Sequence, residues 1–205
     1  MGFYSKYILP SLINLACKQN SHTKQREKVI PLAQGNVLEV GVGPGLNLPL
    51  YDKDKVTKLT AIDPSEDNWK KGKVDISKLP FKFEYINASA ENTPFADNSF
   101  DTIVITYSLC TIPDTKKALL EMRRVLKKEG ILIFCEHGEA PDKNIHFIQD
   151  TINPIWKPFA GGCNLNRNIP EIIEDSGFKI TDLQKMYIPG WKPASYNYWG
   201  TATVL

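Results

Sequence analysis

The segment from Val37 to Leu46 constrains the fold more than any other part of the sequence. It reads VLEVGVGPGL, an apolar run that passes through Glu39 directly into a loop with glycine at every second position. Glycines at this spacing allow a sharp turn and leave amide groups open to a ligand that a Cβ atom would screen. A strand that ends in such a loop predicts an α/β protein with a ligand at the carboxyl edge of its sheet. The loop glycines are Gly41, Gly43 and Gly45.

Apolar runs and segments of helical period alternate along the rest of the chain, which predicts a doubly wound α/β fold with a mostly parallel sheet. Near the C-terminus, two strands are joined by a Pro/Gly segment too short for a crossover helix, so they are expected to pair antiparallel. The expected strands are 36–40, 58–62, 82–86, 102–106, 131–136, 178–186 and 196–204. The expected helices are 115–126, capped by Asp114 and followed by Gly130, 143–155, stopped at Pro154, and 169–176.

The length indicates one domain, residues 1–205, and the net charge is too small to attract a highly charged partner. The 25 basic side chains nearly balance the 23 acidic ones, so nucleic acid is not expected. No apolar run approaches the roughly 18 residues of a spanning helix, and residues 7–17 lack the features of an export signal. The four cysteines form no CxxC pair, which predicts reduced thiols, a cytoplasmic location and no metal. These cysteines are Cys17, Cys110, Cys135 and Cys163.

Charge discriminates between the possible ligands of the glycine loop. Leu46 stands where a dinucleotide fingerprint needs glycine or alanine, and Glu39 would repel a pyrophosphate. A nicotinamide oxidoreductase is therefore disfavoured. A cationic ligand suits Glu39, and S-adenosylmethionine (SAM) carries an ammonium and a sulfonium but no phosphate.

Two further segments follow expected strands and could complete a nucleoside site. Asp63 comes 22 residues after Gly41, where a carboxylate can accept both ribose hydroxyls, although Asp63 with Pro64 could equally form a turn or a helix cap. The small residues 88–90 leave room for an adenine, although they could also be an ordinary loop.

These segments, with 99–104 and 118–126, resemble the class I SAM-dependent methyltransferases over residues 30–136. The resemblance implies a Rossmann-like, seven-stranded sheet with a reversed last strand. It also implies a cofactor site in which Glu39 and the glycines surround the methionine moiety, with Asp63 at the ribose. Pro44 replaces the commoner Thr or Ser of the loop, so no hydroxyl contact is expected there. The remaining cofactor residues that it implies are Pro64, Ala90, Glu91 and Thr106.

The acceptor side carries a narrower resemblance. Residues 108–112, 136–137, 153–156 and 161–167 resemble bacterial relatives of the methyltransferase-like 7 group, which implies transfer to a small, lipophilic thiol. Residues 38–51 instead resemble bacterial phosphatidylethanolamine N-methyltransferases, so a lipid amine is the alternative acceptor. A SAM-binding regulator without catalytic activity is the non-enzyme alternative.

Candidate acceptor residues come from the last third of the chain and from the N-terminus. His137 follows the fifth strand and is the candidate catalytic residue; Glu136 is expected to orient it or to cap a backbone amide. No cysteine is expected to have a depressed pKa, and Arg167 is expected to bind an anionic group or form an ion pair at a helix entry. The candidate acceptor-binding residues are Tyr7, Cys110, Trp156, Cys163 and Arg167.

Two segments are expected to flank the acceptor. Residues 1–30 are expected to form a helical lid, with weak peripheral contact with a membrane as a second possibility. Residues 141–170 are expected to form an insertion on the acceptor side. The sequence leaves the oligomeric state open.

Overall fold

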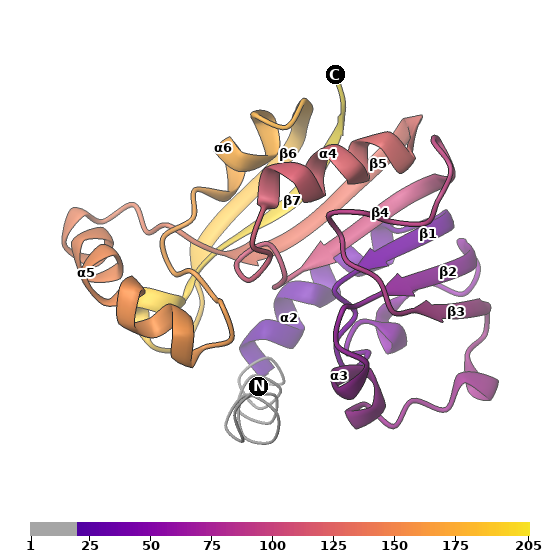
Figure 1. Ribbon diagram of the computed structural model, residues 1–205, viewed down its shortest axis with the longest axis horizontal. Helices are drawn as coiled ribbons and strands as arrows, with labels where there is room; N and C mark the ends of the chain where they lie inside the picture. Colours follow the sequence, from indigo (N-terminus) through magenta and orange to yellow (C-terminus); the bar gives the residue numbers. More distant parts are fainter. Residues whose placement is uncertain (1–19) are drawn as a thin grey trace.

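The computed structural model describes residues 20–205, which form one open sheet with helices on both faces (Figure 1). The sheet has seven strands in the order β3-β2-β1-β4-β5-β7-β6. The chain reverses its direction of strand addition between β1 and β4, and ligands of open α/β sheets bind at such a switch point. The strands are β1 (Gly35–Val40), β2 (Val56–Ile62), β3 (Lys82–Ile86), β4 (Phe100–Thr106), β5 (Leu126–His137), β6 (Phe178–Tyr187) and β7 (Tyr196–Val204).

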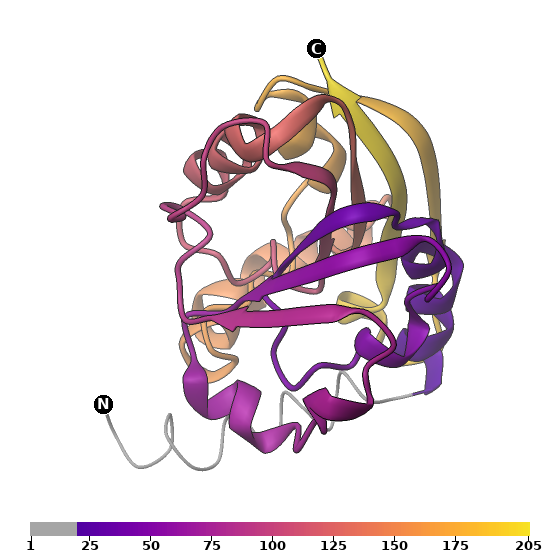
Figure 2. The same ribbon diagram turned by 90° about the vertical axis from the view of Figure 1, so that its right-hand side faces the viewer.

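Helices cover the sheet on both faces. One face carries α4 and α6, which contact each other, and α2 packs against β5 and β7 (Figures 1 and 2). In Figure 1, α5 extends away from the sheet on the side of β6 and β7. The helices are α2 (Asn20–Val29), α3 (Glu66–Lys71), α4 (Thr115–Val125), α5 (Lys143–Phe159) and α6 (Ile169–Glu174). Among residues 20–205, no helix is long and apolar enough to cross a membrane.

The sheet confirms the predicted fold. β7 lies between β5 and β6 and runs antiparallel to both, whereas β1 to β5 pair in parallel. Strand β4 and residues 130–137 of β5 are almost continuously buried because helices cover both faces of the sheet, as their apolar runs predicted. Leu38, Ile103 and Phe134 are fully buried in the core on one side of the sheet.

The predicted end of one helix and the predicted role of one glycine are wrong. Helix α5 continues through Pro154 to Phe159, because the carbonyls that lose a hydrogen bond to Pro154 and Pro158 belong to solvent-exposed residues that water can reach. Helix α4 ends at Val125, one residue before its predicted end, but Gly130 lies inside β5 and does not end the helix. A Cβ atom at Gly130 would lie 2.9 Å from the Asp101 carbonyl oxygen, so tight strand packing explains this glycine.

Candidate functional site

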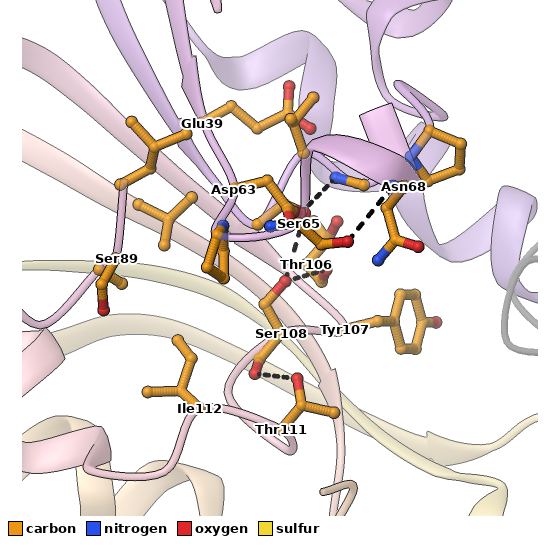
Figure 3. A pocket seen from close by; sticks show the side chains of 18 of the residues that line it. Glu39, Asp63, Ser65, Asn68, Ser89, Thr106, Tyr107, Ser108, Thr111 and Ile112 are labelled. Atoms are coloured by element: carbon orange, nitrogen blue, oxygen red, sulfur yellow. Dashed lines mark hydrogen bonds between the residues drawn. The ribbon is translucent and has the colours of Figure 1, made fainter. Parts of the chain in front are cut away.

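A cavity of about 330 Å³ lies at the carboxyl ends of the central strands (Figure 3). The loops that follow β1, β2, β3 and β4 all contribute to its wall, as expected for the switch point of an open α/β sheet. Arg26 of α2 also reaches it, and Tyr7 of the predicted lid lies outside the described residues. Of the predicted cofactor residues, Glu39, Gly41, Gly43, Asp63, Pro64, Ala90, Glu91 and Thr106 line the cavity.

The three loop glycines have different roles, although all have positive φ. A Cβ atom at Gly41 would lie 2.1 Å from the Ser108 hydroxyl oxygen, and one at Gly45 would lie 2.9 Å from a Leu48 methyl group. Gly45 does not line the cavity, because it packs inward against the loop. Gly43 has a φ of +51° and no atom within 4 Å of its Cβ position, so it leaves open space in the cavity wall.

Asp63 holds the first two loops together. Its Oδ2 accepts a hydrogen bond from the Gly43 amide at 2.9 Å, and its Oδ1 accepts one from the Ser65 amide at 2.8 Å. The turn-capping role considered for Asp63 is therefore present. An ionised carboxylate offers about four lone-pair sites, so Asp63 keeps acceptor capacity for ribose hydroxyls, which stays a prediction.

Glu39 is a buried carboxylate in the cavity wall, with 1% of its surface exposed. The Asn47 amide donates to its Oε1 and the Tyr51 hydroxyl donates to its Oε2, each at 2.9 Å. Asn47 also donates to the Thr106 hydroxyl at 3.0 Å, which connects β1 to β4. Burial raises the pKa of Glu39 to about 7, so a cationic ligand group would stabilise the ionised form.

Hydrogen bonds of Glu91 fix the loop after β3. Glu91 accepts hydrogen bonds from the Ser89 hydroxyl at 3.1 Å and from the Asp114 amide at 2.8 Å, so it joins this loop to the start of α4. Ala88, Ser89 and Ala90 line the cavity beside it. The position near adenine remains a prediction for Ala90 and Glu91, and the short side chains leave the space that this prediction requires.

Tyr107 and Ser108, directly after β4, also line the cavity, although neither is among the predicted site residues. Tyr107 has a φ of +50°, an uncommon conformation for a bulky residue, and its hydroxyl donates to Asn197 Oδ1 at 2.7 Å. The Ser108 and Leu109 amides donate to Glu136 Oε1 at 2.8 and 3.0 Å. Glu136 therefore caps the amides of this turn, the second of its two predicted roles. The sequence offered one signal for Tyr107 and Ser108: both directly follow a predicted strand.

His137 ends β5 beside two sulfur atoms. Its Nε2 lies 3.3 Å from Cys163 Sγ, and Cys110 Sγ belongs to the same cluster. A hydrogen bond from Cys110 and the nearby His137 lower the pKa of the Cys163 thiol, against the effect of burial. The expectation that no cysteine has a depressed pKa is therefore wrong, because residues distant in sequence surround Cys163. Burial lowers the pKa of His137, but the neighbouring Cys163 and Glu136 outweigh this effect and raise it.

None of the predicted acceptor-side residues of the described chain lines the cavity; these are Cys110, His137, Trp156, Cys163 and Arg167. Arg167 donates to the carbonyl oxygens of Leu109 and Ile112. The predicted role in binding an anionic group stays a prediction. The Arg167 guanidinium satisfies carbonyls that the turn after β4 leaves without partners. Trp156 is half-buried, and its ring centroid lies 5.3 Å from that of Trp191.

This sheet order, with the reversed β7 and a glycine loop after β1, is the Rossmann-like fold found in SAM-dependent methyltransferases. The residues present fit SAM: Gly43 leaves an open cradle, and Glu39 offers a buried carboxylate to a cation. A SAM-dependent methyltransferase from Aquifex aeolicus has the same fold, with a TM-score of 0.66, 22% identity, and coverage of 96% of this chain and 98% of that one.

Sequence comparisons identify the family. The family model described as "Methyltransferase domain" matches residues 38–134. Thiol S-methyltransferase TMT1A of Homo sapiens is 31% identical over 88% of this chain and 77% of its own length. Thiol S-methyltransferase TMT1B of Rattus norvegicus is 32% identical over 79% of this chain, which spans 65% of that relative. The chain belongs to the SAM-dependent methyltransferase family that contains these TMT1 proteins, and it is an enzyme with SAM as its cofactor.

Proposed function

We propose that the protein transfers the methyl group of SAM to the sulfur atom of a small, lipophilic thiol. The observation that carries this proposal is the match to proteins named thiol S-methyltransferase over most of the chain. The part of the cavity wall that follows Cys110 supports it, because Ile112 and Pro113 offer uncharged, apolar surface.

Bound SAM supplies a methyl group on a positively charged sulfur. The chain's own residues would hold it through the Gly43 opening, Glu39 and Asp63. Displacement requires the acceptor sulfur, the methyl carbon and the leaving sulfur in line, and proximity of this kind contributes roughly 7 to 11 kcal/mol. The turn at Tyr107 and Ser108, fixed by Glu136, would set this alignment from the side of β4.

His137 and the sulfur atoms beside it are the groups that we propose to act on the acceptor. A free thiol of pKa ~8.5 is a few per cent ionised at neutral pH, so the site gains rate by increasing the thiolate fraction. Glu136 is a positioning residue, because its Oε1 is bonded to backbone amides.

The proposal is tested by S-adenosylhomocysteine release from purified protein and SAM. One arm contains a small alkyl thiol, and a second contains phosphatidylethanolamine vesicles. We expect turnover that depends on the thiol, and Gly43→Val should abolish it because the side chain fills the cofactor opening. Turnover on vesicles alone would overturn the thiol assignment, and SAM binding without turnover on either acceptor would favour the regulator.

A further inference from the structure

Three side chains with sulfur or nitrogen donor atoms, from three separate segments, meet next to residues that line the cavity. Cys110 follows β4, His137 is the last residue of β5, and Cys163 follows α5. Cys110 Sγ, one ring nitrogen of His137 and Cys163 Sγ all lie within 4.8 Å of one another. Cys110 and His137 are buried, with 3% and 8% of their surfaces exposed, and Cys163 is partly exposed.

The spacing of these atoms fits a tetrahedral metal ion. Zinc–sulfur and zinc–nitrogen bonds of ~2.3 and ~2.05 Å at a tetrahedral angle place the two ligand atoms about 3.6 Å apart. The distance from Cys163 Sγ to His137 Nε2 is 3.3 Å, so coordination requires only a small displacement. Two thiolates and an imidazole are a donor set that zinc and similar soft divalent ions prefer.

The backbone holds the ligands in place without an ion. Asn164, next to Cys163, donates through its amide and its side chain to the Cys110 carbonyl oxygen, at 2.8 and 2.9 Å. Arg167 holds the carbonyls of Leu109 and Ile112 on either side of Cys110. A fixed set of ligands lowers the cost of organising the site when an ion binds.

The cluster adjoins the cofactor cavity. Thr111 and Ile112, directly after Cys110, line the cavity, and so does Gly161, two residues before Cys163. Zinc sites with three protein ligands keep a fourth position for water or substrate, whereas structural zinc sites have four protein ligands. The composition of this cluster is therefore that of a site with one open position.

We propose that Cys110, His137 and Cys163 bind a divalent zinc-type ion, whose fourth position takes the acceptor sulfur as a thiolate. The second part rests on the proposed function. The acceptor thiol releases its proton to solvent when its sulfur binds the ion, since a coordinating thiol is deprotonated. A lone pair of that sulfur forms the new bond to the methyl carbon. The bond between methyl and the sulfonium breaks, and its electron pair stays on the leaving sulfur, giving a thioether and S-adenosylhomocysteine.

The first experiment measures metal content. Untagged protein is loaded with Zn²⁺, freed of unbound ions and analysed by elemental mass spectrometry. We expect stoichiometric zinc, strong loss in Cys110→Ser, Cys163→Ser and His137→Ala, and retention in Cys135→Ala. Cys135 is a matched control because it is a buried thiol on β5 that is not part of the cluster. Absence of zinc from the parent protein, or full retention in the ligand variants, would overturn the site.

A second experiment tests the open position. Protein loaded with Co²⁺ should show a sulfur-to-cobalt charge-transfer band, which should change when a small alkyl thiol is added but not when the matching alcohol is added. An unchanged band with thiol would overturn the fourth-position assignment. Bound zinc without turnover on any thiol would instead leave the metal site in place and refute the proposed function. A disulfide between Cys110 and Cys163 in the loaded protein, shown by thiol titration, would also overturn the site.

Discussion

SAM affinity should rise steeply between pH 5 and pH 7 because of Glu39. Burial raises the pKa of this carboxyl to about 7 from an ordinary value of 4.5. The ionised fraction is then about one half at pH 7 and about one hundredth at pH 5. If the cationic groups of SAM restore the ordinary pKa, linkage predicts an affinity about 40-fold higher at pH 7, which is about 2.2 kcal/mol.

The assay is isothermal titration calorimetry with SAM at several pH values, in buffers of different ionisation enthalpy. We expect proton release on binding near pH 6, because SAM favours the ionised carboxylate. Glu39→Gln is the matched control, and it should bind weakly with a much flatter pH dependence. Burial also raises the pKa of Asp63, so the comparison is made on the difference in slope between the two proteins. Equal affinities at pH 5 and pH 7, or the same slope in Glu39→Gln, would refute the role of Glu39.

Three further changes test other parts of the structure. Without SAM, Glu39→Gln should raise Tm at pH 7.5. The buried Glu39 carboxyl has a raised pKa in the folded protein, so the folded protein loses stability as the pH rises from 4.5 to about 7, and glutamine does not ionise. An unchanged Tm would contradict this. Gly43→Ala should lower the free energy of unfolding by only about 1 kcal/mol but should remove most of the SAM affinity. Gly41→Ala should mainly lower Tm, because the new methyl group would contact Ser108. A larger loss of Tm in Gly43→Ala and a larger loss of SAM affinity in Gly41→Ala would refute this distinction. Gln149→Leu should lower the free energy of unfolding, measured with urea, by about 3 kcal/mol. The buried Gln149 side chain forms hydrogen bonds with four backbone groups, which the leucine would leave without partners. A loss under about 1 kcal/mol would refute this role.

The cofactor half of the site could be predicted because its groups act through short stretches of chain. The loop containing Gly41 and Gly43 directly follows a strand, so the strand's direction places it at the ligand-binding edge. Asp63 follows the next strand and reaches the same edge for the same reason. Gly45 shows the limit of this argument: spacing alone does not reveal that it packs against Leu48 instead of lining the cavity.

The acceptor half depended on contacts between distant segments. The cysteines form no CxxC pair in the sequence, but Cys110 and Cys163 belong to one cluster with His137, and Cys163 lies 26 residues from His137 in the chain. Arg167 was assigned to an anion or an ion pair, but its bonds to carbonyls of the turn after β4, 55 and 58 residues away, were not predicted. No local pattern encodes such pairs, because they form only after α5 and the loop behind it pack against the sheet.

The sequence by itself determined the alternation of strands and helices, the reversed β7 and the cofactor loop, because hydrophobic period and glycine spacing act within one element or between neighbouring elements. Only the tertiary structure decided the other features. Glu136 accepts hydrogen bonds from the amides after β4, and α5 continues through Pro154. Cys110, His137 and Cys163 form one cluster. The physical reason is that burial and partner choice depend on which surfaces meet, and long-range packing sets those surfaces.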